Sequence, residues 1–230
     1  MRVCDMIFAD TETASRTTAA PGDVGTCPTC SAPVISKCGS IVSWHWAHAR
    51  GEDCDPWAEP MSAWHLSWQA HAPAERREVI LGRHRADVVG PDGSVVEIQR
   101  SAISTDEIRE REVFYAFFGP MTWIFDARDA YEDQRLDVRW PQTPRTPGYV
   151  TFRWKHPRKS LAACTARVLL DLGGEQLLRV GRIYSDAPCG GWGHILAAPT
   201  VARWISGADC EDRRSAHSAT TRSPAVWRSS

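Results

Sequence analysis

Asp87 and Glu97 could together hold a divalent cation, because a strong turn signal, Gly90-Pro91-Asp92-Gly93, lies between them. A hairpin centred on this turn places Asp87 within about one residue of the position opposite Glu97. Side chains directly opposite each other have Cβ atoms about 4.5–5.5 Å apart. Two carboxylates that close repel each other unless a cation lies between them, and Mg²⁺ commonly uses one or two carboxylates. The spacing alone leaves a solvated strand face as an equally good interpretation.

The elements that must position these acids are two helices and four strands. Val and Ile runs bounded by Gly and Pro predict the strands, and Ser104 with Glu107 predicts a capping box at the start of the second helix. The expected order is helix, three strands, helix, strand, at residues 59–71, 79–81, 85–89, 94–99, 104–118 and 123–125.

An Asp, about ten residues, and then Glu-x-(Lys or Gln) on a hairpin between two helices is similar to the arrangement in PD-(D/E)xK nucleases. Gln99 is expected on the same strand face as Glu97, since alternate residues of a strand face the same way. Many members of that superfamily have Lys in this place, where it can orient the attacking water and stabilise negative charge. A Gln can orient water but brings no charge, which predicts slower catalysis or a greater dependence on metal.

A series of motifs in residues 20–126 resembles the competence protein CoiA family in the same order. These motifs are Cys27-Pro28-Thr29-Cys30, His45-Trp46-Ala47-His48, Glu59 with Trp64-His65, Asp87-Val88-Val89, Glu97-Ile98-Gln99-Arg100-Ser101, Arg111 with Tyr115, and Trp123-Ile124. The resemblance implies a restriction-endonuclease-like core, DNA binding, and DNA processing during uptake or recombination.

By position in this resemblance, Asp87 and Glu97 are expected to hold catalytic Mg²⁺, while Gln99 positions water. Glu59 is expected to be a third carboxylate on the preceding helix, although a helix N-terminal acid favoured by the dipole is an equal alternative. His65 is expected to contact phosphate or an active-site carboxylate, with a packed histidine as the alternative. Gln69 departs from the family, where a Lys often lies.

The cysteines and histidines before residue 55 predict a structural zinc site. Cys27-Pro28-Thr29-Cys30 has the spacing of a zinc knuckle, and Cys38, His45, His48 and Cys54 are further candidate ligands. We expect Cys27, Cys30, His48 and Cys54 to bind Zn²⁺, with His45 as the alternative ligand. A segment with so few aliphatic side chains needs the metal in place of a core. The alternative is a set of unrelated free cysteines.

The composition sets limits on location and partners. The 230 residues include 27 Lys and Arg against 28 Asp and Glu, a net charge of −1, so any DNA contact must use local basic patches. No apolar stretch approaches the roughly 18 residues of a membrane span, and the N-terminus lacks a signal-peptide core. We therefore expect a cytoplasmic protein with no membrane partner, whose cysteines serve metal rather than disulfides.

Arginines around the acids are the candidate DNA contacts. Arg85, Arg100 and Arg111 flank the carboxylates, and Lys155 lies in a basic segment, residues 153–159, where Trp154 could stack on a base. The arginines could equally be counter-ions for the acids, and the basic segment could be an ordinary solvated loop.

The expected architecture is α/β, with a restriction-endonuclease-like core (αβββαβ), an N-terminal zinc module and a small C-terminal β-rich extension. The boundaries are 20–56 for the zinc module, 57–130 for the nuclease-like core, 148–206 for the extension and 207–230 for a disordered tail. Within the extension, Gly190-Gly191-Trp192-Gly193 is expected to be a loop. The expected function is a Mg²⁺-dependent deoxyribonuclease acting on DNA, single- or double-stranded, with recombination proteins as further partners. The alternative is a catalytically weak or inactive DNA-binding or recombination-partner module on the same fold.

Overall fold

The protein is a mixed α/β structure, and the computed structural model describes residues 5–41, 43–49, 54–143, 146–184 and 190–208. The N-terminal strands are β1 (Phe8–Ala9), β2 (Thr17–Thr18), β3 (Val24–Thr26), β4 (Pro33–Lys37) and β5 (His45–His48). The central elements are α1 (Ala63–Gln69), the 3-10 helix η1 (Ala74–Arg76), β6 (Arg77–Leu81), β7 (His84–Val89), β8 (Val95–Gln99), α2 (Thr105–Tyr115) and β9 (Met121–Asp126). The C-terminal elements are α3 (Arg128–Glu132), β10 (Leu136–Arg139), β11 (Tyr149–Trp154), the 3-10 helix η2 (Lys159–Ala163), β12 (Arg167–Gly173), β13 (Gln176–Ile183), β14 (Gly190–Ala197) and α4 (Ala198–Ser206).

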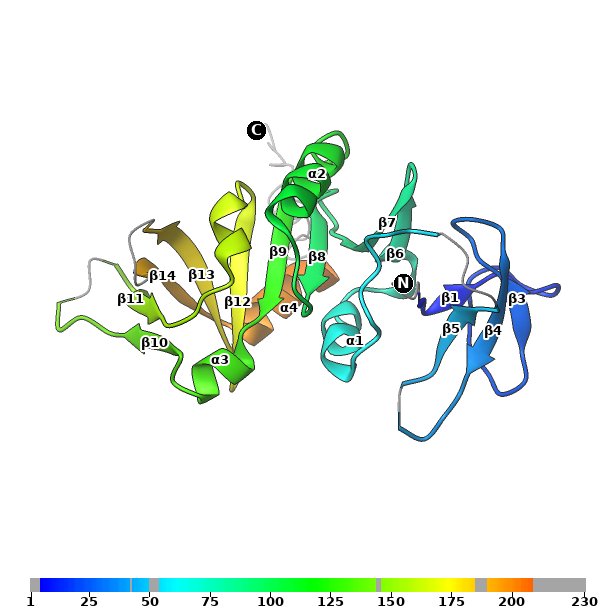
Figure 1. Ribbon diagram of the computed structural model, residues 1–230, viewed down its shortest axis with the longest axis horizontal. Coiled ribbons are helices and arrows are strands. Elements are labelled where there is room, and N and C mark those ends of the chain that lie inside the picture. The colour runs from blue at the N-terminus through cyan, green and yellow to red at the C-terminus, as the bar shows by residue number, and fades with distance from the viewer. Residues whose placement is uncertain (1–4, 42, 50–53, 144–145, 185–189, 209–230) are drawn as a thin grey trace, which may run out of the picture.

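A nine-stranded sheet extends from one end of the molecule towards the N-terminal strands, in the order β10-β11-β14-β13-β12-β9-β8-β7-β6 (Figure 1). It is mostly antiparallel, and β9 runs parallel to both of its neighbours, β8 and β12. The expected order of helix, three strands, helix and strand is confirmed by α1, β6, β7, β8, α2 and β9. The strands after residue 148 belong to this same sheet. The boundary expected between the nuclease-like core and the C-terminal extension, at residues 130–148, therefore stays a prediction.

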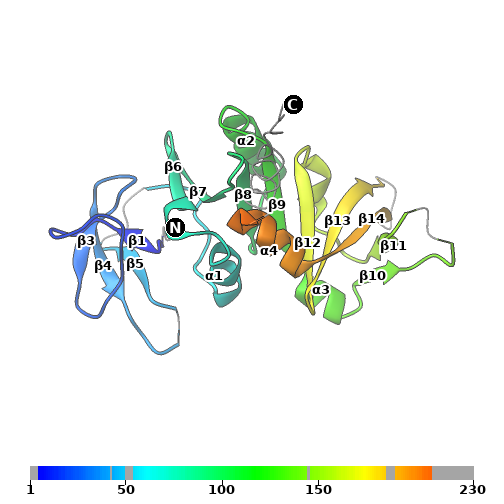
Figure 2. The same cartoon turned by 180° about the vertical axis from the view of Figure 1, so that it is seen from behind.

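Apolar side chains pack on both faces of the sheet. On one face, Ile108 and Tyr115 of α2 pack against Trp123 and Phe125 of β9. On the other face, α1 and α4 cover a cluster that includes Val96 and Ile98 of β8 (Figure 2). The strands around the candidate acids are therefore held rigidly from both sides.

The N-terminal module has its own small cluster of buried side chains. Trp46 of β5 is fully buried and packs with Met6 and Ala9, which lie ahead of the boundary expected at residue 20. Buried polar contacts join this module to the central sheet, because Glu78 Oε2 accepts hydrogen bonds from the backbone N–H groups of Ile7 and Phe8. The module is thus attached to β6 by more than the covalent chain.

Two local expectations were wrong. Glu59 lies outside α1, because the helix begins at Ala63, where Ser62 caps it by accepting a hydrogen bond from the His65 N–H. Residues 190–193 belong to strand β14 instead of a loop. Their glycines fit there because a side chain at Gly191 would collide with the Arg182 carbonyl oxygen and the Phe152 ring.

No helix in the described ranges is long and apolar enough to cross a membrane. The disordered tail expected at residues 207–230 lies almost wholly outside the described residues, which end at residue 208.

Candidate functional site

The turn between β7 and β8 brings Asp87 and Glu97 together. Gly93 has a φ of +79°, and Gly90 donates its N–H to the Ser94 carbonyl oxygen at 2.7 Å, which closes the hairpin. The ladder registers only Val88 with Val96 and Val89 with Val95. The next position along the ladder is therefore Asp87 opposite Glu97, as the turn predicted.

At this position, side-chain hydrogen bonds replace the pairing of the two strands. Asp87 Oδ2 accepts the Ile98 N–H at 2.7 Å, and Glu97 Oε1 accepts the Asp87 N–H at 3.4 Å. The two carboxylates thus occupy the opening where β7 leaves β8. Close acids of this kind are stabilised by a cation between them.

Glu97 is buried against Arg111 of α2. Its carboxylate is 3 % exposed and lies 2.7 Å from Arg111 Nη1, and the Arg111 side chain is 1 % exposed. Arg111 also pairs with Glu107 at 2.6 Å. Burial and, to a smaller extent, the charge of Asp87 together raise the pKa of Glu97 to about 8, against the pull of Arg111. Arg111 therefore matches the counter-ion alternative, since its guanidinium faces acids inside the protein.

Asp87 has a different environment, in which the positive partner is His65 of α1. Burial opposes ionisation of Asp87, but His65, the Ile98 N–H and Arg111 hold the pKa of Asp87 below its usual range. His65 Nε2 lies 3.3 Å from Asp87 Oδ1, and His65 is 1 % exposed. Burial would lower the pKa of His65, but the charge and contact of Asp87, together with the charges of Glu59 and Glu78, outweigh burial and raise that pKa. The structure thus contains the expected contact of His65 with the Asp87 carboxylate, and its role stays a prediction.

Glu59 binds the end of β8 from the segment before α1. Its carboxylate is buried and accepts hydrogen bonds from the Gln99 side-chain amide at 2.6 Å and from the Ser101 hydroxyl and N–H. The Arg100 N–H completes the set at 3.2 Å. Glu59 therefore fixes Gln99 directly. A helix-dipole role for Glu59 is excluded, because α1 begins four residues later.

Several buried oxygen and nitrogen atoms around the acids lack a hydrogen-bond partner among the described residues. Among them are His65 Nδ1, Gln69 Oε1 and Gln99 Oε1. Gln69 adjoins Asp87, since its amide nitrogen donates to the Asp87 carbonyl oxygen at 3.3 Å. Two carboxylates with unpartnered amide oxygens beside them fit the oxygen ligands that Mg²⁺ prefers. Glu59 does not join Asp87 and Glu97 in a compact cluster of three ligands in the described ranges.

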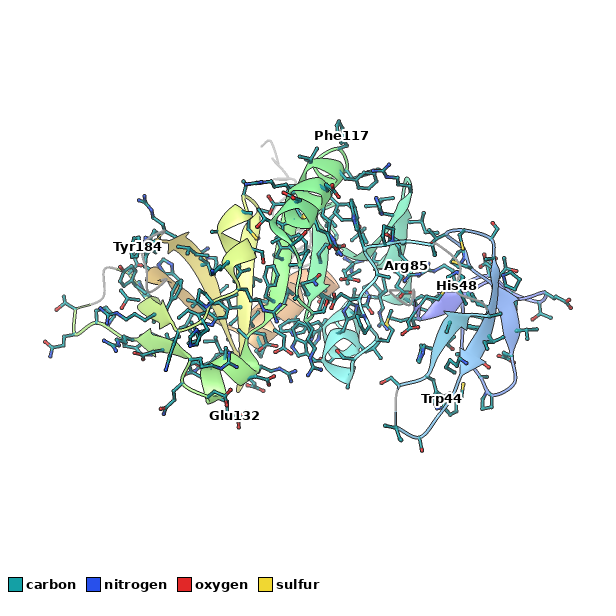
Figure 3. The ribbon with its side chains drawn as sticks, in the orientation of Figure 1. Trp44, His48, Arg85, Phe117, Glu132 and Tyr184 are labelled. Atoms are coloured by element: carbon teal, nitrogen blue, oxygen red, sulfur yellow. The ribbon has the colours of Figure 1, made fainter. Side chains whose placement is uncertain are left out.

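The other candidate DNA contacts differ in their exposure to solvent. The Arg85 guanidinium lies 3.7 Å from Glu78 and donates to the Asp5 carbonyl oxygen at 2.6 Å, so it ties the N-terminal module to β7 (Figure 3). Arg100 keeps 48 % of its side chain exposed, 3.5 Å from Asp126. Lys155 is exposed at the end of β11. These two remain candidates for phosphate contact.

The stacking role considered for Trp154 is wrong. Trp154 is 4 % exposed and belongs to the core cluster on one face of the sheet, together with Leu136 and Leu161. Residues of β11 alternate between the core and the solvent, and Trp154 follows Val150 and Phe152 on the inner face. Its basic neighbours, by contrast, point outward.

The four expected zinc ligands come together in the N-terminal module. Cys27 and Cys30 lie in the turn between β3 and β4, His48 ends β5, and Cys54 follows it. Their ligand atoms all lie within 4.8 Å of one another, with Cys27 Sγ 3.8 Å from Cys54 Sγ and Cys30 Sγ 3.1 Å from His48 Nε2. Tetrahedral zinc with Zn–S bonds of about 2.3 Å separates its sulfurs by about 3.8 Å. The cluster therefore suits a metal such as zinc.

The chemistry of Cys27 supports this assignment. A hydrogen bond from Cys54 and others from the Cys30 and Thr29 N–H groups lower the pKa of Cys27 to about 4, although burial opposes the shift. Thiolates are the form that binds metal. The alternative ligand, His45, lies outside the cluster, with Nε2 3.7 Å from Asp5 and Nδ1 2.7 Å from the Ser43 carbonyl oxygen.

Sequence reasoning assigned no role to Ser101 or Glu78. Ser101 contributes two of the bonds to Glu59, and Glu78 anchors the N-terminal module through Ile7 and Phe8. Ser101 lies in the motif that carries Glu97, but its partner is 42 residues away in sequence. No local signal identifies such a pair.

Comparison with known proteins gives one match. Residues 25–56, which contain all four cysteine and histidine ligands, match the family model for the N-terminal domain of competence protein CoiA. No curated protein and no solved structure matches the chain. The match supports a place for this chain in the CoiA-like family of competence proteins.

Proposed function

We propose that this protein is a Mg²⁺-dependent DNA nuclease with a PD-(D/E)xK, restriction-endonuclease-like core that acts in DNA uptake or recombination. The observation that carries the proposal is the pair of carboxylates, Asp87 and Glu97, in the opening between β7 and β8. The order α1, β6, β7, β8, α2, β9, with β9 parallel to β8, supports the core. The competence name of the matched family supports DNA as the substrate and DNA uptake as the setting.

Asp87 and Glu97 are the residues that would hold Mg²⁺, which would polarise the scissile phosphate and activate water when bound. The chain prepares this place with oppositely charged neighbours, since His65 keeps Asp87 ionised and Arg111 fixes the rotamer of Glu97. Glu59 holds the Gln99 amide nitrogen and leaves Gln99 Oε1 to accept a hydrogen bond from water. The zinc module has a structural role, because its four ligands leave no open position for substrate.

A second candidate function is DNA binding without cleavage, which one observation favours. The Gln99 amide nitrogen is committed to Glu59, so the position that often carries a Lys supplies no positive charge. Transition-state charge would then be stabilised by the metal with little help from the protein. Recombination proteins remain proposed partners under either function.

The test is a cleavage assay on single- and double-stranded DNA, with and without Mg²⁺, on purified protein that retains its zinc. Asp87→Asn and Glu97→Gln should each reduce the rate by roughly a hundredfold or more, because a metal ion supplies several kcal/mol of transition-state stabilisation. Glu110→Gln, on the exposed side of α2, serves as the matched control and should cleave at the wild-type rate. Mg²⁺-dependent cleavage that survives either acid substitution would disprove the site. DNA binding without cleavage by the wild type would support the second candidate.

A further inference from the structure

One face of the C-terminal strands carries aromatic rings and arginines, far from the acid pair along the sheet. The inner face of these strands packs in the core through Val150, Phe152 and Leu178. The outward-facing residues come from all four strands, β10, β11, β14 and β13. They are Asp137, Arg139, Tyr149, Thr151, Arg153, Trp192, His194, Arg179 and Arg182. We call this set the outer face.

Helix α4 leaves the outer face open. Its buried residues, Val201 and Ile205, pack with Leu177 and Leu196 at one end of β13 and β14. Figure 2 shows α4 crossing β8, β9 and β12, while β14 and β11 lie to one side of it. The outer face is therefore the part of this side of the sheet that α4 does not cover.

Three rings form the centre of the outer face. The Tyr149 and Trp192 ring centroids lie 6.0 Å apart with an interplanar angle of 26°, so the two half-buried rings form a stacked pair. His194 stands edge-on to both, 5.9 Å from Tyr149 and 6.0 Å from Trp192. Thr146 and Arg179 contact the two ring nitrogens of His194 at 2.7 and 3.5 Å and fix its orientation.

A β-bulge in β13 makes room for the Trp192 ring. The pairing of β13 with β14 shifts between Val180 and Arg182, so Gly181 is an extra residue opposite Trp192. A side chain at Gly181 would collide with three atoms of the Trp192 six-membered ring. The Trp192 ring thus lies against the glycine, and part of the Trp192 side chain remains exposed to solvent.

Positive charge surrounds the rings. Arg153, Arg179 and Arg182 are exposed, and none of them forms an ion pair within the described part of the chain. Arg139 pairs with Asp137, the single acid of the set. Within the described residues, the face therefore carries three guanidinium groups without an acidic partner, although the whole chain has a net charge of −1.

We propose that the outer face binds single-stranded DNA, with bases stacked on Trp192 and Tyr149 and phosphates paired with Arg153, Arg179 and Arg182. Every base offers a π-face, so stacking tolerates any sequence, and arginines neutralise the backbone. Four strands about 4.8 Å apart give a width of about 14 Å, enough for two or three nucleotides. A duplex fits poorly, because its base faces are already stacked. The choice of DNA rests on the proposed function, whereas the stacking surface does not.

The experiment measures binding of a fluorescein-labelled 12-mer of dT by anisotropy, in the Asp87→Asn background without Mg²⁺ and with zinc retained. Trp192→Leu should weaken binding roughly tenfold, within the range that loss of one stacked base gives. Trp192→Phe should restore most of the affinity. Arg153→Ala should reduce the salt dependence of binding by about 0.7 in log–log slope, the value for one phosphate contact on a single strand.

The matched control is Trp44→Leu, because Trp44 is 54 % exposed but lies at the opposite end of the molecule (Figure 3). Its affinity should equal that of the parent protein. Unchanged binding in both Trp192→Leu and Arg153→Ala would overturn the proposal. So would equal affinity for duplex DNA, or tighter binding of oligo(rU) than of oligo(dT).

Failure of this proposal is separable from failure of the proposed nuclease. If the acids cleave DNA but the outer face does not bind it, the Trp192 and Arg153 variants keep wild-type cleavage at every substrate concentration. If the outer face binds DNA but the acids are inert, the binding differences appear while no protein cleaves.

Discussion

Replacing Glu59 separates a structural role from a metal-binding role. The Glu59 carboxylate is 5 % exposed overall and receives four hydrogen bonds from Gln99, Arg100 and Ser101. In Glu59→Ala, the N–H groups of Arg100 and Ser101 can reach water, because both residues are exposed. The Gln99 amide cannot, because Gln99 is 1 % exposed.

The expected cost of Glu59→Ala follows from these partners. Hydrogen bonds to a charged group contribute about 1.5–3 kcal/mol, and one buried donor left unpaired costs about 1–3 kcal/mol. Gln99 retains a weaker acceptor in the Ser101 carbonyl oxygen at 3.2 Å, which offsets part of the loss. We expect the free energy of unfolding to fall by about 2–3 kcal/mol, which lowers the Tm of a chain this long by about 4–12 °C.

The assay is urea unfolding followed by tryptophan fluorescence, with Glu110→Ala as the control on an exposed helix face. That control should stay within about 0.5 kcal/mol of the wild type. Glu59→Gln should be intermediate, since it keeps the shape and one acceptor. The result that refutes the reasoning is wild-type stability of Glu59→Ala together with lost divalent-cation affinity, because Glu59 would then be a metal ligand.

Three further perturbations have definite expected outcomes. Cys54→Ser should lose zinc and expose the N-terminal module to limited proteolysis, because structural zinc supplies roughly 10–16 kcal/mol of apparent binding energy to folding. Full zinc content of this variant, measured by atomic emission, would contradict the ligand assignment. Gln99→Lys should raise the cleavage rate by returning a positive charge to the site, and a rate equal to the wild type would show that charge at this position does not limit turnover. Asp171→Asn should lower the free energy of unfolding by about 1–3 kcal/mol and change the near-UV circular dichroism spectrum. The reason is that the buried Asp171 carboxylate accepts hydrogen bonds from the indole N–H groups of Trp64 and Trp68. An unchanged spectrum and Tm would argue against these hydrogen bonds.

The sequence predicts the acid hairpin well because its signals are local. The turn at residues 90–93 and the alternation of β8 are enough to place Asp87 opposite Glu97. The cluster of Cys27, Cys30, His48 and Cys54 could be predicted in the same way, since two of the four lie three residues apart and the others come from one short segment. A few neighbouring residues determine such short-range geometry, so one sequence is enough to predict it.

The partners of these residues depend on contacts between distant segments. Glu59 meets Ser101 across 42 residues, and no pattern in either segment indicates the pairing. The continuous sheet depends on β12 lying parallel to β9, which the local alternation of β12 cannot reveal. Trp154 shows the same limit, because its basic neighbours suggest a surface while the strand turns its ring inward.

Glycine was the misleading signal at β14. Four residues with three glycines usually mark a loop, but Gly191 and Gly193 are needed where neighbouring backbone and rings approach closely. The same strand supplies Trp192, which lies over Gly181 of β13. The pairing of β13 and β14 is needed to show that these glycines lie in the strands that form the outer face.

The central claim is that Asp87 and Glu97 form one divalent-cation site, and Mn²⁺ binding to the zinc-loaded protein tests it most directly. Titration followed by electron paramagnetic resonance should show one Mn²⁺ per wild-type chain, displaced by Mg²⁺, and none in Asp87→Asn or Glu97→Gln. Cys38→Ser, whose thiol lies outside the zinc cluster, should bind as the wild type does. Retention of the wild-type Mn²⁺ affinity in both acid variants would contradict the account.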